Sequence, residues 1–117
     1  MRVLLVDDEE ELVVTLAERL GLRGIEADWV TNCEAALETV KHKHFHVAVL
    51  DIKLPRMSGL TLKRKIESLA PDMKFIFMTG HGSKEDFEEG TAEAGDSYYL
   101  LKPVDIESLA DKIREIV

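Results

Sequence analysis

The sequence predicts an α/β fold in which one parallel sheet carries helices on both faces. Residues 3–6, 47–50 and 75–78 are short, continuous apolar runs rich in branched and aromatic side chains, as in strands buried on both faces. Segments with helical spacing of apolar residues alternate with these runs. No linker rich in Pro, Gly or Ser interrupts the alternation, so residues 1–117 are predicted to form a single domain.

Two further segments complete a five-stranded sheet. Residues 25–29 alternate apolar with acidic side chains, a pattern typical of an edge strand or of a strand covered on one face only. Residues 98–101 form the fifth candidate strand. The three continuous runs are therefore expected at the centre of the sheet, with right-handed crossovers between the parallel strands.

Helix start signals lie between the predicted strands. The first helix is predicted from about residue 10 to residue 22, with Gly24 as a left-handed cap. Thr31 and Glu34 form a candidate capping box for the second helix. The remaining candidate caps are Ser58 for the third helix, Ser83 with Asp86 for the fourth, and Asp105 for the fifth.

Charge and cysteine content disfavour several classes of protein. The formal net charge of −8 at pH 7 argues against binding to nucleic acid or to an anionic membrane, because both need a basic surface. Cys33 is the sole cysteine, so no internal disulfide can form and nothing indicates an oxidising compartment. The apolar run of residues 3–6 is too short for a signal peptide or a membrane span. We therefore expect a cytoplasmic protein whose partners are other proteins and metal cations.

Polar residues follow four of the five predicted strands. Asp7 and Asp8 follow the first strand, Asp51 the third, Thr79 the fourth and Lys102 the fifth. Ligands of such sheets bind at the carboxyl ends of the strands, where the strand order reverses. Carboxylates that converge there repel one another by about 4 kcal/mol per close pair, so a cation is expected among them. Oxygen ligands without His or Cys indicate a hard cation, and magnesium fits better than calcium because few protein ligands are available.

A simpler interpretation explains only part of this pattern. The acids of residues 7–11 lie at the start of a predicted helix, where negative charge interacts favourably with the helix dipole. Thr79 alone would be a loop hydroxyl, and Lys102 alone would be a solvated surface lysine. Their occurrence together with Asp51 at the ends of three other strands favours one binding site.

The same residues lie in four motifs that resemble those of a known family. The motifs are VLLVDDEE at residues 3–10, VAVLDIKLPRMSGL at 47–60, FIFMTGHG at 75–82 and YYLLKP at 98–103. The chain resembles the receiver domains of two-component response regulators over essentially its whole length. The resemblance implies a flavodoxin-like, CheY-like fold with strand order 2-1-3-4-5.

The resemblance also implies a role for each site residue. Asp51 would be the phosphoacceptor, whose carboxylate attacks the phosphohistidine of a sensor histidine kinase. Asp7, Asp8, Asp51 and the backbone carbonyl of Lys53 would hold Mg²⁺ beside it. Thr79 and Lys102 would contact the phosphoryl oxygens. The chain would then be a signalling phosphoprotein and not an enzyme that acts on an external metabolite.

A switch that carries the signal is implied in the same way. Tyr99 occupies the switch-aromatic position, where it would fill space left by a shift of Thr79. The face remodelled by this movement would comprise the fourth helix, the fifth strand and the fifth helix. It could contact an output domain or another partner, or form a phosphorylation-dependent dimer, and a histidine phosphotransfer protein could replace the kinase. The resemblance also implies a cis peptide bond between Lys102 and Pro103.

The fourth predicted helix, residues 83–94, is expected to dock least firmly. Phe87 is its only large apolar residue, and an interior Gly90 costs about 1 kcal/mol relative to Ala. A weakly docked element directly after Thr79 would suit a two-state switch.

Two rival functions stay open at the level of sequence. A haloacid-dehalogenase-like phosphatase also uses an aspartyl phosphate and magnesium, but it requires an acid two residues after the nucleophile, where this chain has Lys53. A protein-interaction module of the same fold would act without phosphorylation. The sequence does not identify the cognate kinase, the output, the oligomeric state or the phosphoryl lifetime, or whether the domain acts alone or within a longer regulator.

Overall fold

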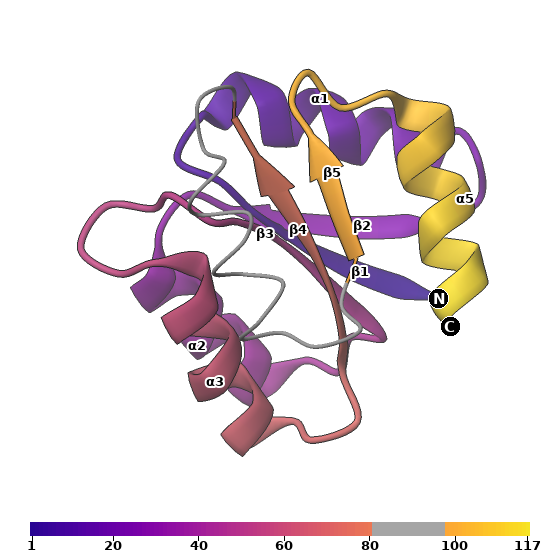
Figure 1. The fold of residues 1–117 in the computed structure, drawn as a ribbon. Helices are drawn as coiled ribbons and strands as arrows, with labels where there is room; N and C mark the ends of the chain where they lie inside the picture. The colour runs from indigo at the N-terminus through magenta and orange to yellow at the C-terminus, as the bar shows by residue number, and fades with distance from the viewer. Residues whose placement is uncertain (81–97) are drawn as a thin grey trace.

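The computed structural model describes residues 1–80 and 98–117, and Figure 1 shows their arrangement as a parallel sheet between helices. The strands are β1 (Arg2–Val6), β2 (Glu26–Val30), β3 (Val47–Asp51), β4 (Lys74–Thr79) and β5 (Tyr98–Leu101). They are all parallel and follow the order β2-β1-β3-β4-β5. The predicted strand order is therefore confirmed. The fourth predicted helix, with its candidate caps Ser83 and Asp86, lies outside the described residues.

Four helices are described, and they cover both faces of the sheet. They are α1 (Glu10–Gly21), α2 (Cys33–His42), α3 (Gly59–Leu69) and α5 (Ile106–Ile116). Figure 1 shows α1 and α5 on one face of the sheet and α2 and α3 on the other. Within the described ranges, no helix is long and apolar enough to cross a membrane.

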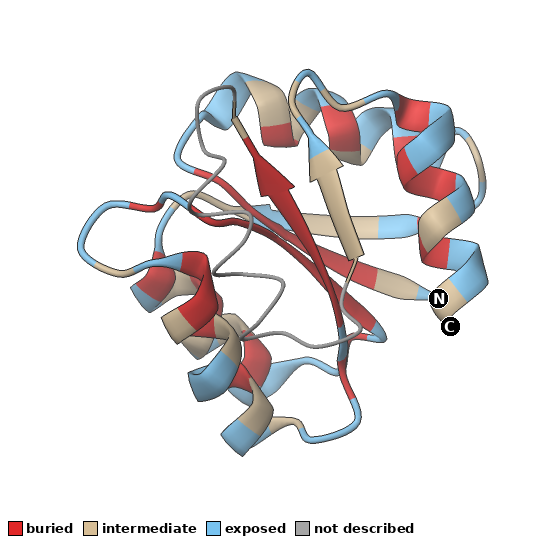
Figure 2. Ribbon diagram, viewed as in Figure 1, coloured by how far each residue is buried: buried red, intermediate tan, exposed pale blue. Residues whose placement is uncertain are grey.

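The three apolar runs of the sequence form the centre of the sheet, as predicted. Every residue of β3 is buried, and so are the last four residues of β1 and the last five of β4 (Figure 2). Alternate side chains enter two different cores. Leu4 and Leu50 pack on the side of α2 and α3, whereas Leu5 and Val49 pack on the side of α1 and α5. By contrast, β2 is an edge strand with no fully buried residue, as its acidic alternation predicted.

The helix caps agree with the sequence in all but one described case. The side chains of Ser58 and Asp105 accept backbone hydrogen bonds at the starts of α3 and α5, as predicted. Gly24 has a φ of +80°, which is the left-handed conformation expected after α1. The predicted box of Thr31 and Glu34 is wrong.

The residue that caps α2 is Asn32. Its extended backbone, with φ −152° and ψ 164°, allows its Oδ1 atom to accept the N–H of Ala35 at 2.8 Å. Thr31 lies one residue too early to reach that donor, and the carboxylate of Glu34 binds Arg56 instead. A one-residue shift of this kind preserves the helix, because Asn is as good a cap as Thr.

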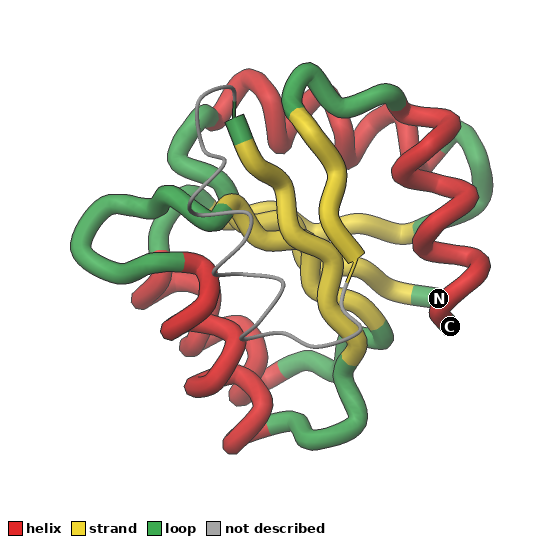
Figure 3. The backbone as a smooth tube through the Cα atoms, in the orientation of Figure 1, coloured by secondary structure: helices red, strands yellow, loops and turns green. Residues whose placement is uncertain are grey.

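The register of the sheet brings four predicted site residues to one edge. Val6 pairs with Leu50, so Asp7 and Asp51 are the next residues along neighbouring strands. Thr79, the last residue of β4, pairs with Leu101, the last of β5. Figure 3 shows the loops that leave this edge and lead to the helices. The fold therefore places Asp7, Asp51 and Thr79 at adjacent strand ends, and Lys102 directly after β5.

Candidate functional site

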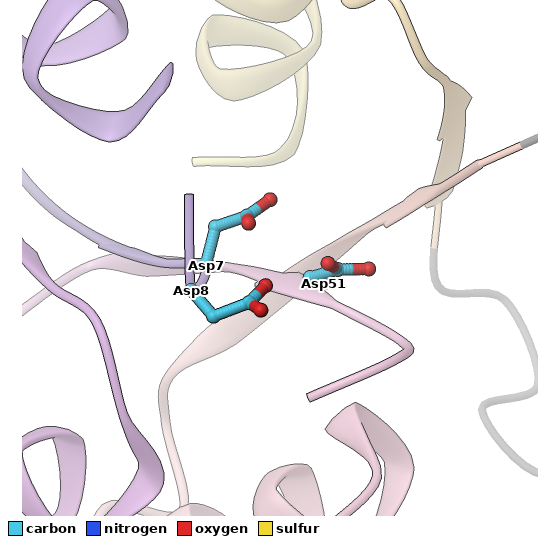
Figure 4. Close-up of side chains that lie close together, drawn as sticks. All are labelled: Asp7, Asp8 and Asp51. Carbon is cyan, nitrogen blue, oxygen red and sulfur yellow. The ribbon is translucent and has the colours of Figure 1, made fainter. Parts of the chain in front are cut away.

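Three carboxylates meet where β1 and β3 end. One oxygen each from Asp7, Asp8 and Asp51 lies within 4.8 Å of the other two (Figure 4). In the described part of the chain, this is the group of His, Cys, Asp or Glu side chains that could hold a metal ion. The prediction that these acids converge is confirmed. An oxygen-only set of this kind suits a hard divalent cation.

The acids of this group differ in their exposure to solvent. Asp7 is 0% exposed and Asp51 is 6% exposed, whereas Asp8 is exposed. Burial is the main reason why the pKa values of Asp7 and Asp51 lie above their ordinary value, and hydrogen bonding and charge from Lys102 oppose that rise. Lys102 therefore offsets only part of the cost of ionising these carboxylates, and a bound cation would offset more of it.

Lys102 brings one positive charge into this cluster. Its Nζ atom lies 2.7 Å from Oδ2 of Asp7 and 3.1 Å from Oδ2 of Asp51. Burial lowers the pKa of Lys102, but the hydrogen bonds and charges of the two aspartates outweigh burial and raise that pKa above its ordinary value. The ammonium is therefore charged at neutral pH. These contacts place Lys102 among the acids at the ends of β1 and β3.

Backbone amides orient two of the carboxylates. The N–H of Lys53 donates to Oδ1 of Asp51 at 3.1 Å, and the N–H of Glu9 donates to Oδ1 of Asp7 at 2.9 Å. In both cases an aspartate binds the amide two residues ahead, as in an Asx turn. Each Asp therefore has one oxygen held by the backbone and the other beside Lys102.

Gly59 packs closely against the backbone of Asp51, and no role was predicted for it from the sequence. A Cβ atom at position 59 would lie 2.2 Å from the carbonyl oxygen of Asp51, well inside any real contact distance. The N–H of Gly59 also donates to the carbonyl of Ile52 at 2.8 Å. The first turn of α3 thus packs directly on the backbone of the acidic residue. A glycine directly after the Ser58 cap is the signal that could have indicated this close approach.

Thr79 presents a buried hydroxyl at the same edge. The residue is 1% exposed, and its Oγ1 atom has no hydrogen-bond partner among residues 1–80 and 98–117. Its carbonyl accepts the N–H of Lys102 at 2.7 Å, which links the end of β4 to the residue after β5. The peptide bond between Lys102 and Pro103 is cis, as the resemblance implied. An unsatisfied buried hydroxyl suits a site that receives an oxygen-rich group.

Tyr99 lies on the face of the sheet that α2 and α3 cover. It pairs with Phe77 in the register of β4 and β5, and the two rings stack with centroids 5.3 Å apart. The side chain is half-buried, and this burial raises the pKa of Tyr99. The ring of Tyr99 is therefore packed against Phe77. Tyr99 lies two residues before Leu101, which pairs with Thr79 at the end of the strands.

Comparison with known proteins identifies the family. The profile of the response regulator receiver domain matches residues 3–114. The two-component response regulator PhoP of Pseudomonas aeruginosa is 36% identical over 117 residues, which is 100% of this chain and 52% of PhoP. The chain therefore spans about half the length of this relative.

Solved structures agree with the sequence comparison. A CheY-like receiver domain from Methanospirillum hungatei JF-1 superposes with a TM-score of 0.86 at 33% identity, covering 97% of this chain and 90% of that one. The BeF3-activated DrrB receiver domain has a TM-score of 0.84 at 26% identity, with 98% and 95% covered. A response regulator from Burkholderia pseudomallei, solved with a phosphorylated aspartic acid, calcium ion and citrate, has a TM-score of 0.81 at 27% identity, with 97% and 71% covered.

Proposed function

Because this chain belongs to the response regulator receiver domain family of two-component signalling, we propose that it accepts a phosphoryl group on Asp51 from a sensor histidine kinase. The observation that carries this assignment is the meeting of three acids from the ends of β1 and β3 around one point. It is a receiver domain and not a metabolic enzyme. Assignment of residues 1–117 to a single receiver domain is part of the same proposal.

The proposed reaction uses the carboxylate of Asp51 as nucleophile. One of its oxygens attacks the phosphorus of a phosphohistidine, the P–N bond breaks, and the imidazole nitrogen leaves with the electron pair and takes up a proton. Lys102, whose Nζ atom already lies 3.1 Å from Oδ2 of Asp51, would pair with a phosphoryl oxygen. The hydroxyl of Thr79, which has no partner within residues 1–80 and 98–117, would donate to another phosphoryl oxygen.

The acids are proposed to hold Mg²⁺ beside the accepting carboxylate. Asp8 and Asp51 would bind the ion directly, with the backbone carbonyl of Lys53, and Asp7 would lie close to the ion or act through water. Few protein ligands are offered, which suits an ion that commonly keeps several waters. When bound, magnesium would neutralise negative charge on the phosphoryl oxygens while the Asp51 oxygen attacks and the imidazole nitrogen leaves.

The phosphoryl group is proposed to change the surface of the domain. It adds about −1.5 to −2 charge at pH 7, which would draw Thr79 and Lys102 inward. Tyr99 would then rearrange from its packing against Phe77 and alter the face that includes β5 and α5. The fourth predicted helix, residues 83–94, would complete this face and lies outside the described residues.

The partners follow from this role. A sensor histidine kinase or a histidine phosphotransfer protein would donate the phosphoryl group, and an output domain, a protein partner or a second copy would contact the altered face. The PhoP relative is about twice as long as this chain, which supports an output region in that protein. A cytoplasmic location is proposed with these partners, and the single free cysteine, Cys33, agrees with a reducing compartment.

The rival functions fare differently. The family match argues against a haloacid-dehalogenase-like phosphatase. Such an enzyme also needs an acid as general acid two residues after the nucleophile, and this chain has Lys53 there. A module of the same fold that works without phosphorylation would not require three acids, a half-buried Lys102 and a buried Thr79 hydroxyl that has no partner among the described residues at one edge.

Mass spectrometry of the intact domain tests the proposal. After incubation with acetyl phosphate and magnesium, the wild-type domain is expected to carry one phosphoryl adduct, which peptide mapping places on Asp51. Asp51→Asn and Asp51→Ala are expected to carry none, and omission of magnesium is expected to reduce adduct formation strongly. An unmodified wild-type domain, or an equal adduct on the Asp51 variants, would support the phosphorylation-independent module.

A further inference from the structure

Lys102 contacts a third acid that has no part in the roles assigned above. Oε1 of Glu9 lies 3.3 Å from Nζ of Lys102, in addition to the contacts that this ammonium makes with Asp7 and Asp51. Glu9 and Asp51 accept hydrogen bonds from this ammonium, while Oδ2 of Asp7 lies at ion-pair distance from it. Glu9 is the exposed member of this set, with 65% of its side chain accessible, and it lies outside the group of three acids that could hold a metal ion.

The backbone of Glu9 is fixed even though its side chain is exposed. Its N–H donates to Oδ1 of Asp7, and its carbonyl accepts the amides of Leu12 and Val13 in the first turn of α1. The residue precedes α1 in an extended conformation, but its side chain makes no capping hydrogen bond to the helix. Its carboxylate is therefore directed to Lys102 from a defined point on the chain.

A cation bound among the aspartates would change how strongly each acid attracts the ammonium of Lys102. Asp7 and Asp51 would then share their negative charge with the ion, and their attraction for the ammonium would weaken. Glu9 would keep its full charge because it lies outside the metal group. In the metal-loaded domain, Glu9 is thus the acid best placed to hold Lys102 at the rim of the site.

We propose that Glu9 is a positioning residue that competes with the phosphoryl group for Lys102. This inference rests on the proposed function, because it concerns the lysine that would pair with a phosphoryl oxygen. Two effects act in the same direction: the Glu9 carboxylate occupies one donor of the ammonium, and its negative charge repels the incoming anion. Glu9 therefore lowers the affinity of the metal-loaded site for a phosphoryl group.

The first experiment measures the affinity of the domain for beryllofluoride at saturating magnesium. Glu9→Gln removes the charge while keeping nearly the same shape, and it is expected to bind about two- to fivefold more tightly than wild type, the range for a partly exposed ion pair. Glu10→Gln is the matched control. It removes the same unit charge from the next residue, an exposed acid in the first turn of α1, and should stay close to wild type.

A second measurement reports on Lys102 itself. In NMR spectra of the magnesium-loaded domain, the side-chain signal of Lys102 is expected to shift in Glu9→Gln and to stay unchanged in Glu10→Gln. Thermal unfolding of both variants checks that neither loses the fold. Equal affinities for the two variants, weaker binding by Glu9→Gln, or an unmoved Lys102 signal would overturn the inference. Failure of the wild-type domain to bind beryllofluoride would instead overturn the proposed function, and this inference with it.

Discussion

At the residue scale, the site places two carboxylates and one hydroxyl out of contact with solvent. Asp7, Asp51 and Thr79 are the buried polar or charged residues of the described chain. A buried polar group without a full set of partners lowers the stability of a fold. The proposed binding of a cation and of a phosphoryl group would offset this loss of stability in the unliganded domain.

Thr79 allows this idea to be tested with a near-isosteric change. Thr79→Val replaces the hydroxyl, which has no partner in residues 1–80 and 98–117, with a methyl group. We expect the unliganded domain to become more stable by about 1 kcal/mol, because an unsatisfied buried hydroxyl is removed. Urea unfolding measures this change.

The same variant should bind beryllofluoride less tightly, since a donor to the proposed phosphoryl group is lost. Thr79→Ser is the control, because it retains the hydroxyl and should retain most of the affinity. A Thr79→Val domain that is destabilised and binds as tightly as wild type would contradict both expectations.

The buried acids give a pH dependence of stability with a defined sign. Burial raises the pKa of Asp51, so the folded domain holds this proton more tightly than the unfolded chain does. Above the raised pKa, the folded state bears the whole penalty of the ionised group. The penalty disappears as the pH falls below the ordinary pKa of an aspartate.

Asp51→Asn should therefore be more stable than wild type at pH 7 without divalent cations. The difference in unfolding free energy should shrink as the pH falls through the raised pKa of Asp51, because wild type then becomes neutral at this position as well. Denaturant unfolding of both proteins at several pH values measures the difference. A difference that grows toward acid pH would show that the Asp51 pKa is lowered by folding, against this account.

Sequence reasoning identified the residues that directly follow buried strands. Asp7, Asp51 and Lys102 could be predicted because the end of an apolar run fixes where the next side chain emerges. The contact of Glu9 with Lys102 could not be predicted, because it joins residues 93 positions apart through two long side chains. Metal ligation by the Lys53 carbonyl and the switch role of Tyr99 stay predictions.

At the element scale, the junction between β3 and α3 holds Asp51 in place. The start of α3 approaches the backbone of Asp51 so closely that position 59 has no space for a side chain. Helix and strand are therefore coupled directly at the site. A displacement of α3 would displace Asp51 relative to Asp7 and Asp8.

Substitution of this glycine tests the coupling. Gly59→Ala would place a Cβ atom 2.2 Å from the Asp51 carbonyl oxygen and 3.0 Å from its carbonyl carbon, so the backbone must shift. We expect a loss of about 1–3 kcal/mol of stability, as for overpacked cores, and weaker magnesium binding.

Gly21→Ala is the matched control for that substitution. Gly21 ends α1, and a Cβ atom there would meet nothing within 4 Å. The change should leave stability equal or raise it by up to about 1 kcal/mol, because Ala favours a helix over Gly. Chemical unfolding and magnesium titration compare the two variants. Equal effects of the two substitutions would argue against the coupling of α3 to Asp51.

Helix boundaries show the limit of sequence reasoning at this scale. Ser58 and Asp105 were predicted as caps and act as caps, whereas α2 begins one residue later than the box of Thr31 and Glu34 indicated. Thr31 and Asn32 are both good cap residues, and the choice between them depends on the backbone angles set by the end of β2. A local pattern cannot determine those angles.

At the scale of the whole molecule, strand order and register create the site. Continuous apolar runs predicted a parallel sheet with helices on both faces, and the family resemblance supplied the order of its strands. The register that sets Asp51 beside Asp7 depends on packing between distant segments, which spacing along the chain does not define. Any change of order that separated β1 from β3 would remove the cluster of acids.

The excess of negative charge at this edge of the sheet favours the binding of a divalent cation. The domain has a net charge of −8, and within it three acids lie around one point. Lys102 supplies a single positive charge there, so a divalent cation would bring the cluster closer to neutrality. Burial of Asp7 and Asp51 strengthens the expected attraction, because the local dielectric constant is lower than that of water.

The most direct measurement is the location of a divalent ion by anomalous scattering from crystals grown with manganese, a stand-in for magnesium. We expect one strong peak between the ends of β1 and β3, at coordination distance, about 2.1 Å for magnesium, from carboxylate oxygens of Asp8 and Asp51. Crystals of Asp51→Ala should show a weakened peak or none. A wild-type domain with no ion at this edge, or with its ion bound elsewhere, would contradict the claim that the strand ends form a metal-assisted phosphoacceptor site.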